Sequence, residues 1–163
     1  MDRLHRRGML DMLRRNKAIK DFPQHWQHVG DVNKFDLLIC FEHRVKEKLL
    51  DDLRSRREAL RGRASHLPPP DPGHIVWIVT LDVRDAVDDA AKAAEHAQFI
   101  VDALMRHLPD HLDRGQSKQT AMESLVPGIV KQLQRHYKLP PVHCRPFAFS
   151  VAKEHSSASG SSR

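Results

Sequence analysis

The chain has few of the residues that usually mark a specialised site. Cysteine occurs only as Cys40 and Cys144, too few for a disulfide framework and without the spacing of a zinc site, so a reducing compartment, nucleus or cytosol, is expected. The 7 glycines stand singly, which excludes the glycine-rich loops that bind nucleotides. No apolar run reaches the length of a membrane span, and no secretory signal follows Met1.

Aromatic residues are also scarce, at 6%, whereas charged residues make up 29% of the chain. The 163 residues fit one domain with a core that buries roughly two thirds of the unfolded surface. A net charge of +6 favours acidic partners such as phosphopeptides, nucleic acid or acidic proteins, although solubility alone explains it equally well. Because stacking residues are few, direct nucleic-acid binding through the basic residues between Arg3 and Lys20 is not favoured.

Apolar spacing in the first part of the chain predicts a helix, a strand and a second helix. A basic amphipathic helix is expected over residues 4–19. The short apolar run at 35–40 is typical of a strand that is buried on both faces. The helix that follows is predicted to place four apolar residues on its buried face: Val45, Leu49, Leu50 and Leu53.

Prolines divide the middle of the chain. Residues 61–73 are predicted to form a proline-rich inserted surface loop, with a polyproline ligand as the alternative. A strand is expected at 74–81, and the alanine-rich stretch after it predicts a helix from about residue 86 that ends before Pro109.

The last part of the chain shows the same alternation of helix and strand. Residues 116–136 are predicted to be helical, and Pro127 indicates either a kink or a later start. The run at 142–151 contains Pro146, which suits an edge strand. We therefore expect one α/β domain over residues 1–152, a three-layer sandwich with a mostly parallel sheet, and a disordered tail at 153–163.

Two acidic residues, Asp82 and Asp85, stand where the strand at 74–81 ends. In an open α/β sheet, ligands and catalytic groups gather beyond the carboxyl ends of the strands. These residues could cap the next helix, together with Asp88 and Asp89. Alternatively, one of them could act as a general acid that protonates a leaving group. The local sequence leaves both explanations open.

Neither cysteine has the sequence of a phosphatase nucleophile. That chemistry requires Cys, five residues and Arg in a strand-to-helix loop, where backbone N–H groups and the guanidinium hold phosphate and lower the thiol pKa. Six positions after Cys40 stands Lys46, and six positions after Cys144 stands Ser150. We therefore expect Cys40 to be a buried residue at a strand end and Cys144 to be structural.

The sequence gives no indication of a metal or a cofactor. His107 and His111 have the spacing of zinc ligands on a helix, but Pro109 lies between them and no further Cys or His completes a motif. No metal site and no cofactor are expected.

Three segments, in this order and spacing, resemble the RNA polymerase II carboxy-terminal-domain phosphatases of the "suppressor of SUA" type, which are related in fold to low-molecular-weight tyrosine phosphatases. The segments are Gly8-Met-Leu-Asp-Met-Leu-Arg-Arg-Asn-Lys-Ala-Ile-Lys20, Phe35-Asp-Leu-Leu-Ile-Cys-Phe-Glu-His-Arg-Val45 and Val79-Thr-Leu-Asp-Val-Arg-Asp85. The resemblance runs from about residue 8 to residue 149 and is strongest over 8–97.

The resemblance implies roles for individual residues. Asp85 matches the aspartate that acts as general acid toward the serine leaving oxygen, and Asp82 matches an acid that supports the site. Met12 matches a position near the substrate groove. The family also uses a cysteine thiolate and a loop arginine, but Cys40 stands one place before the family's strand-end cysteine, where Phe41 is found here.

The family's amino-terminal strand and its Cys and Arg phosphate loop have no counterpart in these 163 residues. The resemblance therefore implies an N-terminally truncated or degenerate phosphatase that is inactive alone. Its substrate would be phosphoserine in the heptads of the polymerase tail. The resemblance also implies a role in transcription and mRNA 3′-end processing, a nuclear location, and a symplekin-like scaffold as partner. The alternative is a non-catalytic module that binds a scaffold or a phosphopeptide.

Overall fold

The computed structural model describes residues 14, 17–18, 25–60, 70–71, 73–84 and 86–149. The chain divides into two compact units, residues 1–30 and residues 31–163. In the first unit the three described residues of the expected helix at 4–19 are helical, and Trp26–His28 form a 3-10 turn, η2. The expected single domain over 1–152 stays a prediction, and the tail at 153–163 lies outside the described residues.

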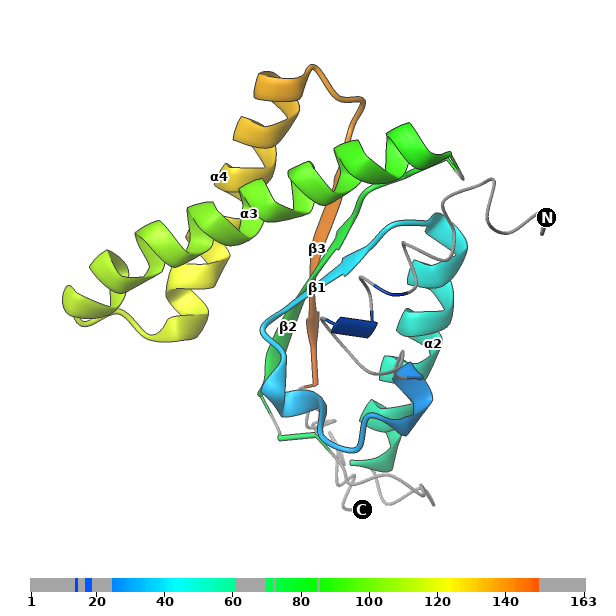
Figure 1. Ribbon diagram of the computed structural model, residues 1–163. Coiled ribbons are helices and arrows are strands. Elements are labelled where there is room, and N and C mark those ends of the chain that lie inside the picture. Colours follow the sequence, from blue (N-terminus) through cyan, green and yellow to red (C-terminus); the bar gives the residue numbers. More distant parts are fainter. Residues whose placement is uncertain are drawn as a thin grey trace, which may run out of the picture. The chain divides into compact units, whose positions relative to one another are not determined.

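A three-stranded sheet lies between helices in the second unit (Figure 1). The strands β1 (Leu37–Cys40), β2 (Ile75–Thr80) and β3 (His143–Ala148) follow one another in this order across the sheet. β1 pairs with β2 in parallel, whereas β3 pairs with β2 antiparallel. The predicted α/β class is confirmed, with a sheet that is mixed in the described residues.

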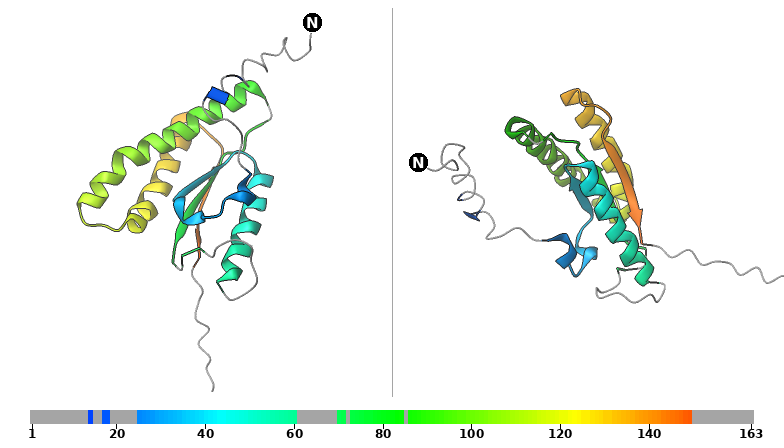
Figure 2. Two further views of the ribbon diagram at one scale, coloured as in Figure 1. Left: turned by 60° about the horizontal axis from the view of Figure 1, so that its bottom comes forward. Right: turned by 90° about the vertical axis from the view of Figure 1, so that its right-hand side faces the viewer.

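Helices cover both faces of this sheet, and the two views of Figure 2 show the layers. Helix α2 (His43–Ala59) lies on one face. Helices α3 (Val87–Asp113) and α4 (Lys118–Tyr137) pack against each other on the opposite face. None of the helices in the described part of the chain is long and apolar enough to cross a membrane.

The side chains of β2 alternate between the two faces, as the period of a strand requires. Trp77, Val79 and Leu81 join the main core, which they share with apolar residues of α3 and α4. The side chains that alternate with them, Val76 and Ile78, are also fully buried and point to the face that α2 covers. The long apolar run at 74–81 thus reflects a strand buried on both sides.

Helix α2 is rotated by about one residue from the predicted orientation. Leu49, Leu50 and Leu53 are buried as expected, but Val45 is 46% exposed, whereas Lys46 is only 8% exposed. A lysine can bury its aliphatic stem if its ammonium finds partners. The Lys46 ammonium lies 3.0 Å from Glu47 Oε1, which makes its burial tolerable. The predicted buried position of Val45 was wrong.

Two prolines lie inside helices and end neither of them. The prediction that a helix stops before Pro109 was wrong, because α3 continues to Asp113. A later start after Pro127 was also wrong, because α4 begins at Lys118. A proline removes one backbone N–H, and the extensive packing between α3 and α4 offsets that loss.

The edge position predicted for the strand with Pro146 is confirmed, since β3 ends the sheet. The proline-rich loop at 61–73 is described only at residues 70–71 and 73. Pro70 is fully buried, which corrects the prediction of a surface position for this residue. The backbone N–H of Asp71 donates to Asn33 Oδ1 at 2.9 Å and holds this end of the loop against the turn before β1.

Exchanging Leu53 for alanine tests the observed orientation of α2. Leu53 is 0% exposed, so Leu53→Ala should lower the free energy of unfolding by about 3 kcal/mol, from lost burial and a residual cavity. Val45→Ala on the same helix is the matched control and should change it by less than about 0.5 kcal/mol. Urea unfolding followed by circular dichroism measures both. Equal losses would show that Val45 also faces the core.

The outer edge of β1 leads to a second prediction. Among the described residues, no strand pairs with β1 on the side away from β2, and such an apolar edge promotes association with other chains. We expect this 163-residue chain to self-associate or to be marginally stable. Sedimentation equilibrium and thermal unfolding at several concentrations measure this. A monomer with a cooperative transition at about 45–65 °C, the usual mesophile range, would contradict it.

Candidate functional site

The candidate site lies beyond the carboxyl ends of β1 and β2 (Figure 1). Two backbone hydrogen bonds continue the strand pairing past these ends. The N–H of Leu81 donates to the carbonyl of Cys40 at 2.8 Å, and the N–H of Val83 donates to the carbonyl of Phe41 at 3.1 Å. The segments that leave the two strands therefore run side by side, in the position where α/β sheets bind their ligands.

A cavity of about 380 Å³ opens between these two segments, and we call it the exit cavity. Its walls are residues 41–44 at the start of α2, residues 82–84 after β2, and Ala90 of α3. The cavity is polar: the Arg44 guanidinium lies 2.5 Å from the Glu42 carboxylate, and Arg84 lines it from the other segment. The N-terminal end of α2 adds its positive dipole.

Asp82 lines the exit cavity and is exposed. The N-cap of α3 is Ala86, which makes no side-chain capping bond, so helix capping does not account for Asp82. Asp88 and Asp89 lie in the first turn of α3, where their charges complement the helix dipole. The two explanations therefore apply to different residues. Asp88 and Asp89 stabilise the start of α3, whereas Asp82 borders the cavity.

Two predicted site residues, Asp85 and Met12, lie outside the described residues. The residues on either side of Asp85 are described, and the N–H of Ala86 donates to the carbonyl of Arg84 at 2.8 Å. Asp85 as general acid, Asp82 as its support and Met12 in a substrate groove all stay predictions.

Both cysteine thiols lie in environments that keep them protonated. Cys40 is the last residue of β1 and is 5% exposed, which confirms the buried strand-end position. Burial raises the pKa of its thiol, and the charge of Lys46 opposes this only in part. Burial also raises the pKa of Cys144 to about 11. A nucleophilic thiol requires the opposite shift.

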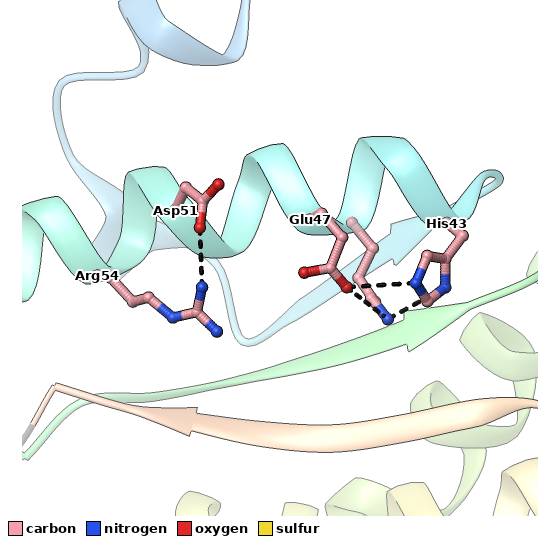
Figure 3. Close-up of polar contacts among 5 residues, drawn as sticks. His43, Glu47, Asp51 and Arg54 are labelled. Atoms are coloured by element: carbon pink, nitrogen blue, oxygen red, sulfur yellow. Dashed lines mark hydrogen bonds and ion pairs between the residues drawn. The ribbon is translucent and has the colours of Figure 1, made fainter.

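The sequence did not indicate a polar cluster between α2 and β3, shown in part in Figure 3. The Lys46 ammonium lies 3.3 Å from His43 Nδ1, and His43 Nε2 lies 3.4 Å from Glu47 Oε1. The rings of His43 and His143 are 6.3 Å apart. The hydrogen bond from Lys46 lowers the pKa of Glu47. The cluster lies in the first turns of α2, which form one wall of the exit cavity, and it contacts the sheet through the His143 ring.

The sequence analysis also missed Arg44 and Arg84 as cavity residues. The available signal was their position, since each follows within four residues of a strand end. Arg44 in the first turn of α2 and Arg84 on the facing segment together favour an anionic ligand such as phosphate. In the described part of the chain, no group of three His, Cys, Asp or Glu side chains is arranged to hold a metal ion.

The family model described as "Ssu72-like protein" matches residues 2–147. The chain belongs to this family. A relative from Dictyostelium discoideum, named as the RNA polymerase II C-terminal domain phosphatase SSU72, is 32% identical over 132 residues, 81% of this chain and 53% of the relative. The Danio rerio protein of the same name is 36% identical over 87 residues, 53% of this chain and 38% of its own length. The chain thus spans about half the length of such Ssu72 relatives.

A solved structure of an Ssu72 protein has a similar fold. It is the Drosophila melanogaster Ssu72 with Symplekin, bound to a cis peptidomimetic phosphoserine peptide of the polymerase C-terminal domain. The similarity has a TM-score of 0.61 at 18% sequence identity and covers 89% of this chain and 62% of that one. At this level of identity, the comparison establishes the fold alone, and the phosphatase-like α/β fold inferred from the sequence is confirmed.

Thiol alkylation tests the assignment of both cysteines as non-nucleophilic. With a pKa of about 11, about one Cys144 thiol in a thousand is ionised at pH 8. Iodoacetamide should therefore label the folded protein slowly, with a Cys144 rate that rises about tenfold per pH unit from pH 7 to 9. Mass spectrometry measures this, and the same reaction in urea is the control. Rapid labelling of Cys40 or Cys144 at pH 7 would overturn the assignment.

Proposed function

We propose that this chain forms the acidic side of a phosphoserine phosphatase site that acts on the C-terminal domain of RNA polymerase II. One observation carries the proposal: the paired exits of β1 and β2 place Asp82 across the exit cavity from the N-terminus of α2. Membership of the Ssu72-like family supplies the reaction. The resemblance at Asp85, three residues further on, supplies the general acid.

The chemistry of a phosphoserine ester matches these groups. A nucleophile attacks phosphorus, the phosphorus–oxygen bond to serine breaks, and the serine oxygen leaves with a proton from a general acid. We assign that proton to Asp85, supported by Asp82. Arg44 and Arg84 at the exit cavity would balance the charge of the phosphate.

In this sequence neither cysteine is followed six positions later by an arginine, so the phosphatase nucleophile motif is missing. Removing a nucleophile typically lowers turnover by several orders of magnitude. We therefore propose that these 163 residues bind the phosphopeptide without hydrolysing it. The protonated state of both thiols favours the same conclusion. The second candidate function is a non-catalytic module that binds a scaffold or a phosphopeptide and is not part of any phosphatase site.

Partners and location follow from the same proposal. The Drosophila melanogaster Ssu72 was crystallised with Symplekin and a phosphoserine peptide of the C-terminal domain. For this chain we propose a symplekin-like scaffold and the phosphorylated polymerase tail as partners. The relatives are named as phosphatases of RNA polymerase II, a nuclear enzyme, so we propose the nucleus as its location and transcription with mRNA 3′-end processing as its process.

A titration with a fluorescent phosphoserine peptide of the polymerase tail tests this proposal. We expect binding that requires the phosphate and no release of phosphate. Arg84→Ala should weaken binding about tenfold, because it removes a charge-assisted contact. Arg106→Ala is the matched control, since Arg106 is exposed on α3 and does not line the exit cavity.

Two results would contradict the proposal. Equal affinity for the phosphorylated and unphosphorylated peptides would exclude phosphate recognition at the exit cavity. Robust phosphate release that is lost in Asp85→Asn would show that the chain has its own nucleophile, against the proposed inactivity.

A further inference from the structure

A second cavity lies on the other side of the segment that carries Asp82. It has a volume of about 270 Å³ and is lined by residues 80–84, by the first turns of α3, and by residues 139–142 between α4 and β3. We call it the proline-walled cavity. Residues 82–84 line both this cavity and the exit cavity. A ligand bound at the exit cavity can therefore reach the proline-walled cavity by crossing one short segment of backbone.

The walls of this cavity are mostly apolar, and several of them are flat rings. Leu81 and Ala93 are 3% exposed each and line the cavity together with the exposed rings of Pro140 and Pro141. The imidazole of His96 is the other ring in the lining. The imidazole of His96 offers an aromatic side chain a stacked or edge-to-face contact, and the apolar walls disfavour a charged side chain.

A ring contact and burial both act on the His96 side chain. Its centroid lies 4.4 Å from that of Tyr137 at an interplanar angle of 61°, an edge-to-face contact between aromatic rings. Burial lowers the pKa of His96, which favours the uncharged imidazole. The cavity is smaller than the usual pocket for a drug-sized ligand, about 300–1,000 Å³, and its size suits one side chain.

Charges at the rim fit the same kind of ligand. Lys92 and Asp89 line the cavity and lie 3.8 Å apart, so they largely balance each other. Arg84 borders both cavities and brings its positive charge to their junction. A ligand that fits both cavities would place an anionic group at Arg84 and an aromatic ring between the prolines. A phosphopeptide with an aromatic residue near the phosphoserine has these two groups.

We propose that the proline-walled cavity binds a tyrosine or phenylalanine side chain of the phosphopeptide whose phosphate lies at the exit cavity. This inference rests on the proposed function and adds a determinant of specificity to it. The chain then prefers phosphoserine peptides with an aromatic residue close to the phosphoserine. Ala93 and His96 are the residues that set this preference.

The first test examines the proline-walled cavity without phosphate. N-acetyl-tyrosine amide is titrated into the chain, and the Ala93 methyl and His96 ring signals are followed by NMR. We expect saturable shifts of both signals and a weaker response to N-acetyl-leucine amide. Ala93→Leu fills the cavity and should weaken binding at least about tenfold. Ala94→Leu, on the exposed side of α3, is its control and should not change binding.

A second pair of variants covers the case in which Ala93→Leu does not fold. His96→Ala removes one ring of the cavity and should weaken binding of the amide about tenfold, whereas His107→Ala changes a histidine on the same helix that does not line the cavity and should have no effect. No shift of the Ala93 or His96 signals by the tyrosine amide, or equal binding by His96→Ala and wild type, overturns the proposal.

The second test uses two phosphoserine peptides that differ only in a tyrosine-to-alanine exchange near the phosphoserine. We expect about tenfold tighter binding of the tyrosine peptide, with the difference lost in His96→Ala. Equal binding of both peptides overturns the aromatic site and leaves the proposed function intact. Binding of the tyrosine amide without binding of either phosphopeptide supports the aromatic site and contradicts the proposed function.

Discussion

The arrangement of the site depends on backbone pairing that continues beyond the ends of β1 and β2. The hydrogen bonds from Leu81 N–H to Cys40 and from Val83 N–H to Phe41 hold the two exit segments together where regular strand structure has ended. A free segment would lose conformational entropy on binding a ligand, whereas a paired one has already lost it. Asp82 and Arg84 are therefore presented at fixed positions along a shared backbone, and two cavities open beside it.

The two faces of the sheet contribute differently to that arrangement. On one face, α3 and α4 enclose an apolar core with Trp77 and Val79. On the other, α2 packs through leucines but also buries Lys46, whose ammonium contacts His43 and Glu47. A buried charge is tolerated only with such partners. These contacts lie in the first turns of α2, the part of the helix that forms a wall of the exit cavity.

The sequence predicted what depends on local periodicity and missed what depends on distant contacts. The runs at 35–40 and 74–81 indicated β1 and β2 because continuous apolar character identifies a doubly buried strand. The helix end at Pro109 was wrong because packing between α3 and α4 outweighs one lost hydrogen bond. Asp82 was singled out because strand exits are known sites for ligands, and it does line a cavity there. The cavity beside His96 was not, since Pro140 and Pro141 reach it only through the turn of α4 into β3.

The central claim is that a phosphoserine peptide binds where β1 and β2 end. Amide hydrogen exchange, with and without the peptide, tests this most directly because it reports on each backbone segment. The account predicts slower exchange at residues 41–44 and 82–84, the segments that line the exit cavity, with no change at the opposite end of the sheet near Lys118. Protection confined to residues around Lys118 and Met122, or no protection at a saturating peptide concentration, would contradict it.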